Sequence, residues 1–374
     1  MRKILYGLMA VALMSACQND DTDFSEYTNG TTSSISTIYI NYDGDDVSVT
    51  GDTKGYVSAK GADVTVNAES STDSLLIVLS GTTSNGSLLV FRQTAYGIKL
   101  NGAKIHNVDG PAINNQCSKW LYLEIADGTT NTLSDGTIYE NTGISASEID
   151  AKGCLFSEGQ VYISGTGQLD ITGNYKHAFA CDDYIVIDDD VTMNINTGTG
   201  NGIKANDGLW INKGTIGIGV TADGARGIRC DSVVVINGGY IGINTTGDCV
   251  YDETEGDYSS AACIKCESQF TMTAGTLKLI SSGDGGKGIN CAADVVFSGG
   301  ELLAKTTGSN DNGKPKAIKS DTGIIVSGGS FSAYVNKSWA CDNGSDSEEP
   351  ADHITVKGSP KTQNITKKTV EITY

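Results

Sequence analysis

Charged side chains recur at fixed places in a repeated stretch of this sequence. Four cations directly follow the apolar residue of a repeated "GI"-like pair, and we name them the cation row: Lys204, Arg229, Lys265 and Lys319. Carboxylates stand two residues after the position of these cations in the repeat, and we name them the acid row: Asp182, Asp231, Glu267 and Asp321. Residues two apart on a β-strand point to the same side. The spacing therefore predicts two parallel rows of opposite charge on one surface.

Three kinds of chemistry fit these rows. Stacked carboxylates offer the hard oxygen ligands that suit Ca²⁺, and acidic loop residues could add to them. The predicted metal ligands are Asp182, Asp223, Asp231, Asp284 and Asp321. The cations could bind a polysaccharide, or one of them could act as the base of a Ca²⁺-dependent polyuronate lyase. The alternative is a solvated surface on which neighbouring charges neutralise each other and contribute little.

A row of mostly apolar residues is expected on a second outward surface. Its members stand seven residues after the apolar residue of each pair: Tyr162, Val186, Trp210, Val235, Thr271, Val296 and Ile325. Such residues favour strands, or they offer a platform for sugar rings, with Trp210 as the best stacking candidate. If the row contacted another protein instead, the chain would be a structural adhesin.

Residues that mark catalytic sites are sparse. The three histidines, His106, His177 and His353, do not have the spacing of a zinc site. Asp182 and Asp183 are adjacent, and adjacent residues on a strand point to opposite faces, so an acid/base pair is not expected. The sequence therefore favours a non-catalytic binding protein over an enzyme.

Short strands must position these residues. The repeats are centred on apolar residues 24 to 36 positions apart: Leu155, Phe179, Ile203, Ile228, Ile264, Ile289 and Ile318. Within each repeat, apolar residues alternate with others in three short bursts between glycine-containing turns, which indicates strands. Repeats of this length stack because a single one cannot bury a core. The predicted fold is an all-β parallel β-helix with three strands per coil and a period of about 24 residues.

Cysteines gather at one inward position of the repeat, namely Cys181, Cys230, Cys266 and Cys291. Cys341 stands in the same relation to Trp339. Neighbours one coil apart are separated by about 4.8 Å, which suits neither one metal ion nor an ordinary disulfide. We therefore expect buried free thiols. Cys249 and Cys263 bracket an insertion, and a disulfide could close that loop in an exported protein.

The overall charge limits the choice of partner. The chain has 45 acidic and 26 basic residues, a net charge of −19. Nucleic acid is not expected as a partner, because phosphate contacts need a basic patch and counterion release. Cations, cationic groups or neutral sugars fit this composition better.

The N-terminus has the pattern of an export signal. Arg2 and Lys3 precede a short apolar run that ends in "LMSAC", which resembles a bacterial lipobox with Cys17 as the acylated residue. The acidic "QNDDTD" that follows resembles a surface-export signal. We expect an exported lipoprotein, anchored by lipid to the outer membrane and exposed at the cell surface.

These patterns divide the chain into four segments. Residues 1–17 are expected to be the signal peptide and lipobox, and residues 18–35 a flexible tether. Residues 36–345 would form the parallel β-helix, and residues 346–374 would form strands that cap its open end.

One stretch also resembles a known family. Residues 98–136, "IKLNGAKIHNVDGPAINNQCSKWLYLEIADGTTNTLSDG", followed by "GNYK" at 173–176, are similar to a bacterial family of carbohydrate-binding β-helix proteins of the clostridial cellulose- and polygalacturonate-binding type. The resemblance implies a right-handed parallel β-helix similar to family 9 polysaccharide lyases. It also implies bound Ca²⁺, and binding of cellulose or polygalacturonate without established catalysis.

The chain departs from that family two residues before the centre of each repeat. The family pattern has Asp there, whereas this chain has His177, Asn201, Arg226, Ala262, Lys287 and Lys316. The change weakens the expectation of Ca²⁺ and adds cations. The predicted carbohydrate-binding residues are therefore Lys204, Trp210, Arg226, Arg229, Lys265, Lys287 and Lys319, with no catalytic residue assigned.

Overall fold

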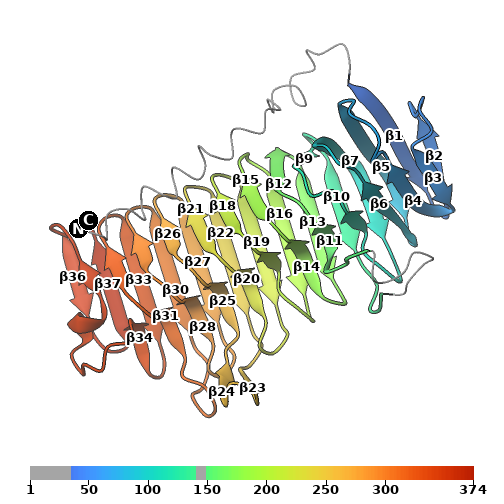
Figure 1. Cartoon of the computed structure of the whole chain (residues 1–374). Helices are drawn as coiled ribbons and strands as arrows, with labels where there is room; N and C mark the ends of the chain where they lie inside the picture. Colours follow the sequence, from blue (N-terminus) through green and yellow to red (C-terminus); the bar gives the residue numbers. More distant parts are fainter. Residues whose placement is uncertain (1–34, 140–148) are drawn as a thin grey trace.

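The computed structural model describes residues 35–139 and 149–374. This part of the chain is an elongated solenoid whose coils stack along one axis (Figure 1). Its walls are strands, mostly parallel, and the described residues include a single short 3-10 helix, η2 (Pro350–His353). No helix in these two ranges is long and apolar enough to cross a membrane. The predicted all-β parallel solenoid is confirmed.

Three ladders of parallel strands run along the solenoid. The first ladder contains β8 (Ile113–Asn115), β11 (Gly153–Ser157), β14 (His177–Cys181), β17 (Ile203–Ala205), β20 (Arg226–Cys230), β25 (Ala262–Cys266), β28 (Lys287–Cys291), β31 (Lys316–Ser320) and β34 (Trp339–Asp342). The second contains β9 (Leu121–Ile125), β12 (Val161–Gly165), β15 (Tyr184–Ile187), β18 (Gly208–Ile211), β21 (Val233–Ile236), β26 (Phe270–Met272), β29 (Val295–Phe297), β32 (Ile324–Val326) and β35 (Thr355–Val356). The third contains β10 (Thr130–Ser134), β13 (Gln168–Gly173), β16 (Thr192–Thr197), β19 (Thr215–Val220), β22 (Tyr240–Thr245), β27 (Thr276–Ser281), β30 (Glu301–Thr306) and β33 (Ser330–Val335).

The first coils have two walls rather than three. This region contains β1 (Ser36–Asp43), β2 (Asp46–Thr50), β3 (Val57–Lys60), β4 (Ala62–Asn67), β5 (Leu75–Thr83), β6 (Gly86–Phe91) and β7 (Tyr96–His106). The long strand β7 pairs with β9 through its first half and with β10 through its second half. In this coil, the single strand β7 therefore takes the place of one second-ladder strand and one third-ladder strand. The predicted three strands per coil are present from β8 onward.

Antiparallel strands close both ends of the solenoid. At the N-terminal end, β2 pairs antiparallel with β1, and β3 pairs antiparallel with β4. At the other end, β37 (Thr369–Thr373) pairs antiparallel with both β33 and β36 (Thr362–Ile365). The parallel pairing of the coils thus does not continue past either end.

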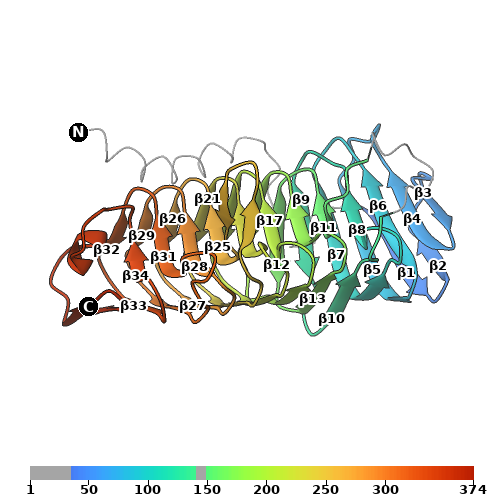
Figure 2. The ribbon, with the colours of Figure 1, turned by 90° about the horizontal axis from the view of Figure 1, so that it is seen from below.

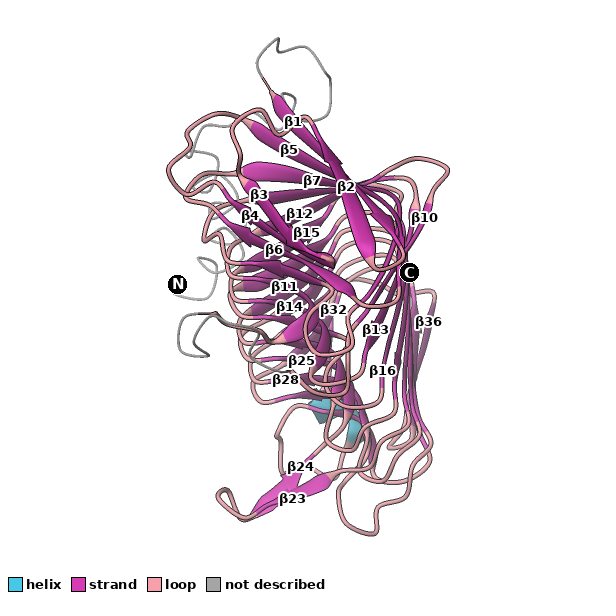
Figure 3. Ribbon diagram, turned by 90° about the vertical axis from the view of Figure 1, so that its right-hand side faces the viewer, coloured by secondary structure: helices cyan, strands magenta, loops and turns pink. Residues whose placement is uncertain are grey.

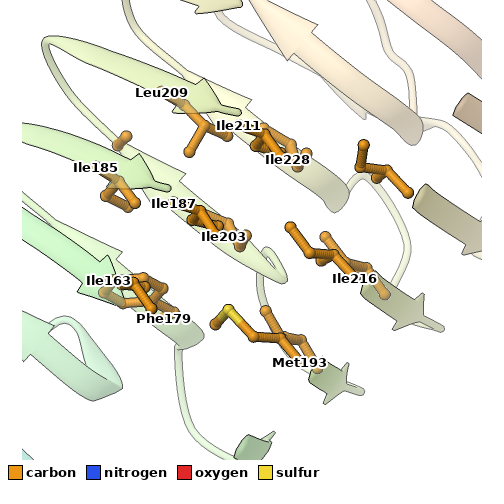
Figure 4. Close-up of a cluster of buried hydrophobic side chains, with 14 of the residues drawn as sticks. Ile163, Phe179, Ile185, Ile187, Met193, Ile203, Leu209, Ile211, Ile216 and Ile228 are labelled. Carbon is orange, nitrogen blue, oxygen red and sulfur yellow. The ribbon is translucent and has the colours of Figure 1, made fainter. Parts of the chain in front are cut away.

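Inward side chains from all three ladders form the core. Figure 4 shows Ile203 of the first ladder, Ile211 of the second and Ile216 of the third, with their counterparts in neighbouring coils. All three are fully buried. Burial of such a side chain contributes about 1.5–3 kcal/mol, and stacking supplies each coil with neighbours on both sides.

The "GI" glycine of β20, Gly227, lies where this first-ladder strand packs on the core. A Cβ on Gly227 would lie 2.2 Å from Cγ2 of Ile243 and 2.6 Å from the carbonyl oxygen of Cys263. The backbone therefore packs directly on the core there, and other coils have alanine or cysteine at this place. The residue before this place is the first residue of β20, β25, β28 and β31, so these residues lie along one edge of the first ladder, at the corner where the loops enter it.

The cysteines are free and buried, as expected for this part of the chain. Within the described ranges, all nine cysteines are free thiols with little or no exposure. The strand register pairs Cys230 with Cys266 and Cys266 with Cys291. The Sγ atoms of Cys266 and Cys291 are 3.2 Å apart.

Two expectations about cysteines are wrong. Cys249 and Cys263 form no disulfide: the thiol of Cys249 lies near Asp284, and that of Cys263 contacts Thr245. Cys341 does not continue the inward cysteine position, because it pairs with Ile318 while Trp339 pairs with Lys316. The register of the last coil therefore differs by two residues from the one predicted. The indole of Trp339 lies at the corner beside His353 instead of in the narrow core.

Candidate functional site

The first ladder carries cations over five consecutive coils, from β17 to β31. Figure 2 labels β17, β25, β28 and β31 of these coils along one side of the solenoid. The strand register aligns Lys204, Arg229, Lys265 and Lys319 with one another and with Asn290, so the predicted cation row is confirmed as a row. A second row lies at the outer corner, and we name it the corner row: Arg226, Ala262, Lys287 and Lys316. At the outward positions of these five coils, six partly exposed cations face three carboxylates of the acid row, while Lys316 is only 6% exposed. The surface is therefore basic in a chain of net charge −19.

Ion pairs partly neutralise the cation row. Arg229 Nε lies 3.2 Å from Asp231, Lys265 Nζ 2.9 Å from Glu267, and Lys319 Nζ 2.6 Å from Asp321. Lys204 also contacts Asp231, at 2.6 Å. Burial would raise the pKa of Asp231, but the hydrogen bond and charge of Lys204 and the charge of Arg229 outweigh it and lower that pKa. This part of the surface matches the self-neutralising alternative.

The corner row is less neutralised. Arg226 Nη2 donates to the Ser259 hydroxyl at 2.7 Å, and Lys287 donates to the hydroxyl of Ser260. Burial, reinforced by the charge of Lys319, lowers the pKa of Lys287 to about 8, and burial lowers that of Arg226 to about 10. Lys316 is ion-paired with Asp342. The hydrogen-bond partner of Lys287 is thus a neutral hydroxyl, and the ammonium of Lys287 loses its proton near pH 8.

A hairpin stands beside the corner row, outside all three ladders. It consists of β23 (Val250–Asp252) and β24 (Asp257–Ser259), and it projects from one corner of the solenoid in the end-on view (Figure 3). Tyr251 and Tyr258 face each other across it, with ring centroids 5.2 Å apart. Sequence reasoning considered this insertion only for a disulfide. The available signal was the 36-residue length of this repeat and the two tyrosines in its insertion.

Trp210 is not the exposed platform expected from the sequence. It lies on the second ladder, away from the basic surface, and its side chain is only 7% exposed. Its ring lies over Gly208, where a Cβ would approach ring carbons to 2.3 Å. The ring of Tyr184 packs on it from the preceding coil, with centroids 5.5 Å apart. Because glycine and tyrosine accommodate the indole, Trp210 is a packing residue.

The predicted loop ligands for Ca²⁺ serve the backbone instead. Asp223 Oδ1 accepts the amide of Asp248 at 2.8 Å, and Asp248 Oδ1 accepts the amide of Asp284 at 2.7 Å. Asp284 in turn accepts the amides of Asp311 and Asn312 at 3.1 and 2.9 Å. Each carboxylate therefore links one coil to the next, which explains acidic residues at this turn without a metal.

The remaining predicted ligands do not converge either. Asp231 and Asp321 are held in the ion pairs described above. In the described ranges, the carboxylates of Asp150, Glu158 and Asp182 form the single group of three whose oxygens lie within 4.8 Å of one another. The ammonium of Lys152 already contacts two of them, Asp150 at 2.6 Å and also Asp182. The predicted ligands thus do not gather at one point in the described ranges.

The structure brings together six of the seven predicted carbohydrate-binding residues. Lys204, Arg229, Lys265 and Lys319 share the cation row, and Arg226 and Lys287 share the corner row, all on the first ladder. Trp210 lies apart from them. The hairpin tyrosines adjoin the same surface and were missed, and Lys316, also on the first ladder, is nearly fully buried. Cys17, the predicted lipid-bearing residue, lies outside the described residues.

Comparisons with known proteins agree with this fold. A solved structure, the gadolinium derivative of a polysaccharide lyase-like protein from C. thermocellum, matches with a TM-score of 0.56 and 22% identity. The match covers 71% of this chain and 100% of that one, and it shows a similar fold alone.

Sequence comparison names a family. A carbohydrate-binding domain-containing protein from Acetivibrio thermocellus is 27% identical over 104 residues. That match spans 27% of this chain and only 36% of the relative. The model of the family described as carbohydrate-binding domain-containing protein matches residues 60–231 and 219–311, most of the solenoid. The chain therefore belongs to the family of carbohydrate-binding domain-containing proteins.

Proposed function

We propose that the basic surface of the first ladder binds a polysaccharide without cleaving it. The observation that carries the proposal is the grouping of six partly exposed cations on five stacked coils of an acidic chain. Stacked coils repeat their outward side chains about every 4.8 Å, so the surface offers a polymer a series of similar contacts. Membership of the carbohydrate-binding family supports a sugar polymer as the partner.

The charge of the surface favours a polymer that carries carboxylates, such as polygalacturonate, over neutral cellulose. Charge-assisted hydrogen bonds from Lys and Arg to carboxylates are roughly twice as strong as neutral ones. The ion-paired cation row must give up part of its existing contacts to bind an anion. Lys287 gives up only a hydroxyl contact, and we therefore place the strongest anion contact at the corner row.

A polyuronate lyase is the second candidate, and the lowered pKa of Lys287 is the observation that favours it. A lysine with a pKa of about 8 is a usable general base near neutral pH. Its neutral amine would take the proton beside the uronate carboxylate. The glycosidic C–O bond would break, a C=C bond would form in the ring, and the leaving oxygen would take a proton from water. The earlier candidates of the cation row are engaged by carboxylates and suit this role less well.

Two further properties are part of the proposal. The misfit of the predicted ligands supports binding that does not require Ca²⁺. The lipobox-like "LMSAC" supports a lipid anchor at Cys17 that holds the solenoid at the outer surface of the cell. Loss of membrane association and of labelling by a radioactive fatty acid in Cys17→Ala would test the anchor.

A co-sedimentation experiment tests the function. The soluble protein lacking residues 1–17 is mixed with insoluble polygalacturonate or cellulose, each with Ca²⁺ and with chelator. We expect binding to polygalacturonate that persists in chelator and is weakened in Lys287→Ala. Lys305→Ala, on the third ladder, is the matched control and should bind normally. Release of ultraviolet-absorbing unsaturated products would favour the lyase, and absence of binding to both polymers would contradict the proposal.

A further inference from the structure

The hairpin presents exposed apolar side chains that lie outside the three ladders. Tyr251 is 51% exposed, and Val250 beside it is 45% exposed. The hairpin forms a separate two-stranded sheet, so its side chains lie outside the core of the coils. Large exposed apolar surfaces on a soluble protein commonly mark binding sites. The exposed face of a tyrosine ring suits the apolar face of a sugar, and its hydroxyl can hydrogen-bond to the sugar hydroxyls.

The base of the hairpin is joined to the corner row. Ser259, directly after Tyr258, accepts the hydrogen bond from Arg226, and Ser260 accepts the one from Lys287. The hydroxyl of Tyr258 lies 3.3 Å from Asn312 Oδ1 on the next loop. These contacts fix the tyrosines next to the corner row, so one polymer chain can reach both.

The turn of the hairpin has the opposite charge to the corner row. It carries four acidic residues within six positions, Asp252, Glu253, Glu255 and Asp257. Asp257 is close enough to Lys287 to oppose the fall in its pKa. A carboxylate-bearing sugar placed against Tyr251 would be repelled by this turn, whereas a neutral sugar would not. The two parts of the surface therefore favour different sugars.

We propose that the hairpin binds a neutral sugar residue of an acidic heteropolysaccharide whose carboxylate-bearing residues lie on the corner row. The inference rests on the proposed function and adds a class of ligand to it. The preferred polymer contains both kinds of sugar, and a polymer of uronate alone leaves the tyrosine faces empty.

Three polymers and matched variants test this inference. Affinity is measured for polygalacturonate, for a rhamnogalacturonan in which galacturonate alternates with neutral rhamnose, and for a neutral glucan. Wild-type protein should bind the alternating polymer best. Tyr251→Ala should weaken that binding about tenfold, as loss of about 1.4 kcal/mol of contact does, and leave polygalacturonate affinity unchanged. Tyr240→Ala removes another tyrosine of similar exposure, 44%, on the third ladder, and should change neither affinity.

A second variant tests the charge of the turn. Replacing Glu253 and Glu255 by glutamine should strengthen binding of polygalacturonate, because the repulsion at the hairpin is reduced. Unchanged affinities in both the tyrosine and the glutamine variants, with wild-type protein still binding polygalacturonate, would overturn the inference and leave the proposed function standing. Failure of wild-type protein to bind any of the three polymers would overturn the proposed function itself.

Discussion

The affinity for a polyuronate should fall as pH rises past about 8. Lys287 has a pKa of about 8 in the free protein, because burial and the charge of Lys319 disfavour its ammonium form. Below that pH it is charged and can donate to a carboxylate of the ligand. Above it the amine is neutral and the charge-assisted bond is lost. The uronate carboxylates stay ionised throughout, since their ordinary pKa lies near 4.

The size of the effect follows from the type of bond. A hydrogen bond to a charged group contributes about 1.5–3 kcal/mol, and 1.4 kcal/mol is a factor of ten in affinity. A tenfold preference for the charged form raises the pKa of the bound lysine by one unit. Affinity should therefore be constant up to about pH 8, fall about tenfold between roughly pH 8 and pH 9, and then level off.

Titration calorimetry with soluble oligogalacturonate at constant ionic strength provides the assay. Lys287→Arg is the matched variant, because arginine keeps its proton to a higher pH than lysine, and Arg226 in the same row has a pKa of about 10. Its affinity should change little between pH 7 and pH 9. A wild-type affinity that is equally flat would refute the contact between Lys287 and the ligand. Cleavage that appears and accelerates as pH rises through about 8 would instead identify Lys287 as a base.

Four other expectations follow from the same structure. Lys287→Met should raise the free energy of unfolding at pH 7 by up to about 3 kcal/mol, because the pKa of Lys287 is about 8 in the folded protein and 10.5 when the side chain is exposed. This gain in stability should shrink as pH rises from 8 to 10.5, and urea unfolding at both pH values checks the sign. Gly227→Ala should lower the free energy of unfolding by about 1–3 kcal/mol through the collision with Ile243, and a stability equal to wild type would mean that the corner can move. Trp210→Ala should cost about 3 kcal/mol of stability yet leave glycan affinity unchanged, and selective loss of binding in a folded variant would restore the platform. A thiol reagent should react with the nine described cysteines only after unfolding. If fewer than nine of them react in denaturant without reductant, a disulfide is present.

The repeat was predictable from sequence because its rule is local. An apolar residue at every second position gives strands, and the recurring order of the three bursts within each repeat stacks them in register, so the alignment of Ile203 with Ile228 follows from counting. The cation row depends on the same register and could be placed in the same way. The shift at Cys341 could not be seen, because it depends on the room available for Trp339 in the last coil.

The remaining features depend on contacts between coils. Trp210 looks exposed by its position on a strand, and only its packing on Gly208 and Tyr184 buries it. Asp223 looks like a metal ligand until the amide of Asp248 is found at its oxygen. The hairpin follows no repeat pattern, so counting says nothing about where its tyrosines lie.

The confinement of the cations to β17–β31 and the antiparallel strands at both ends of the solenoid together give the binding surface a finite length. These strands terminate the parallel pairing, so one molecule does not extend its surface by stacking on the next. The five basic coils then span four intervals of about 4.8 Å, or roughly 19 Å. Short oligosaccharides fill only part of this length and engage few cations. Affinity should rise with each added sugar until the oligosaccharide spans the five basic coils, and it should stay constant for longer chains. The solenoid would thus discriminate between oligosaccharides by their length.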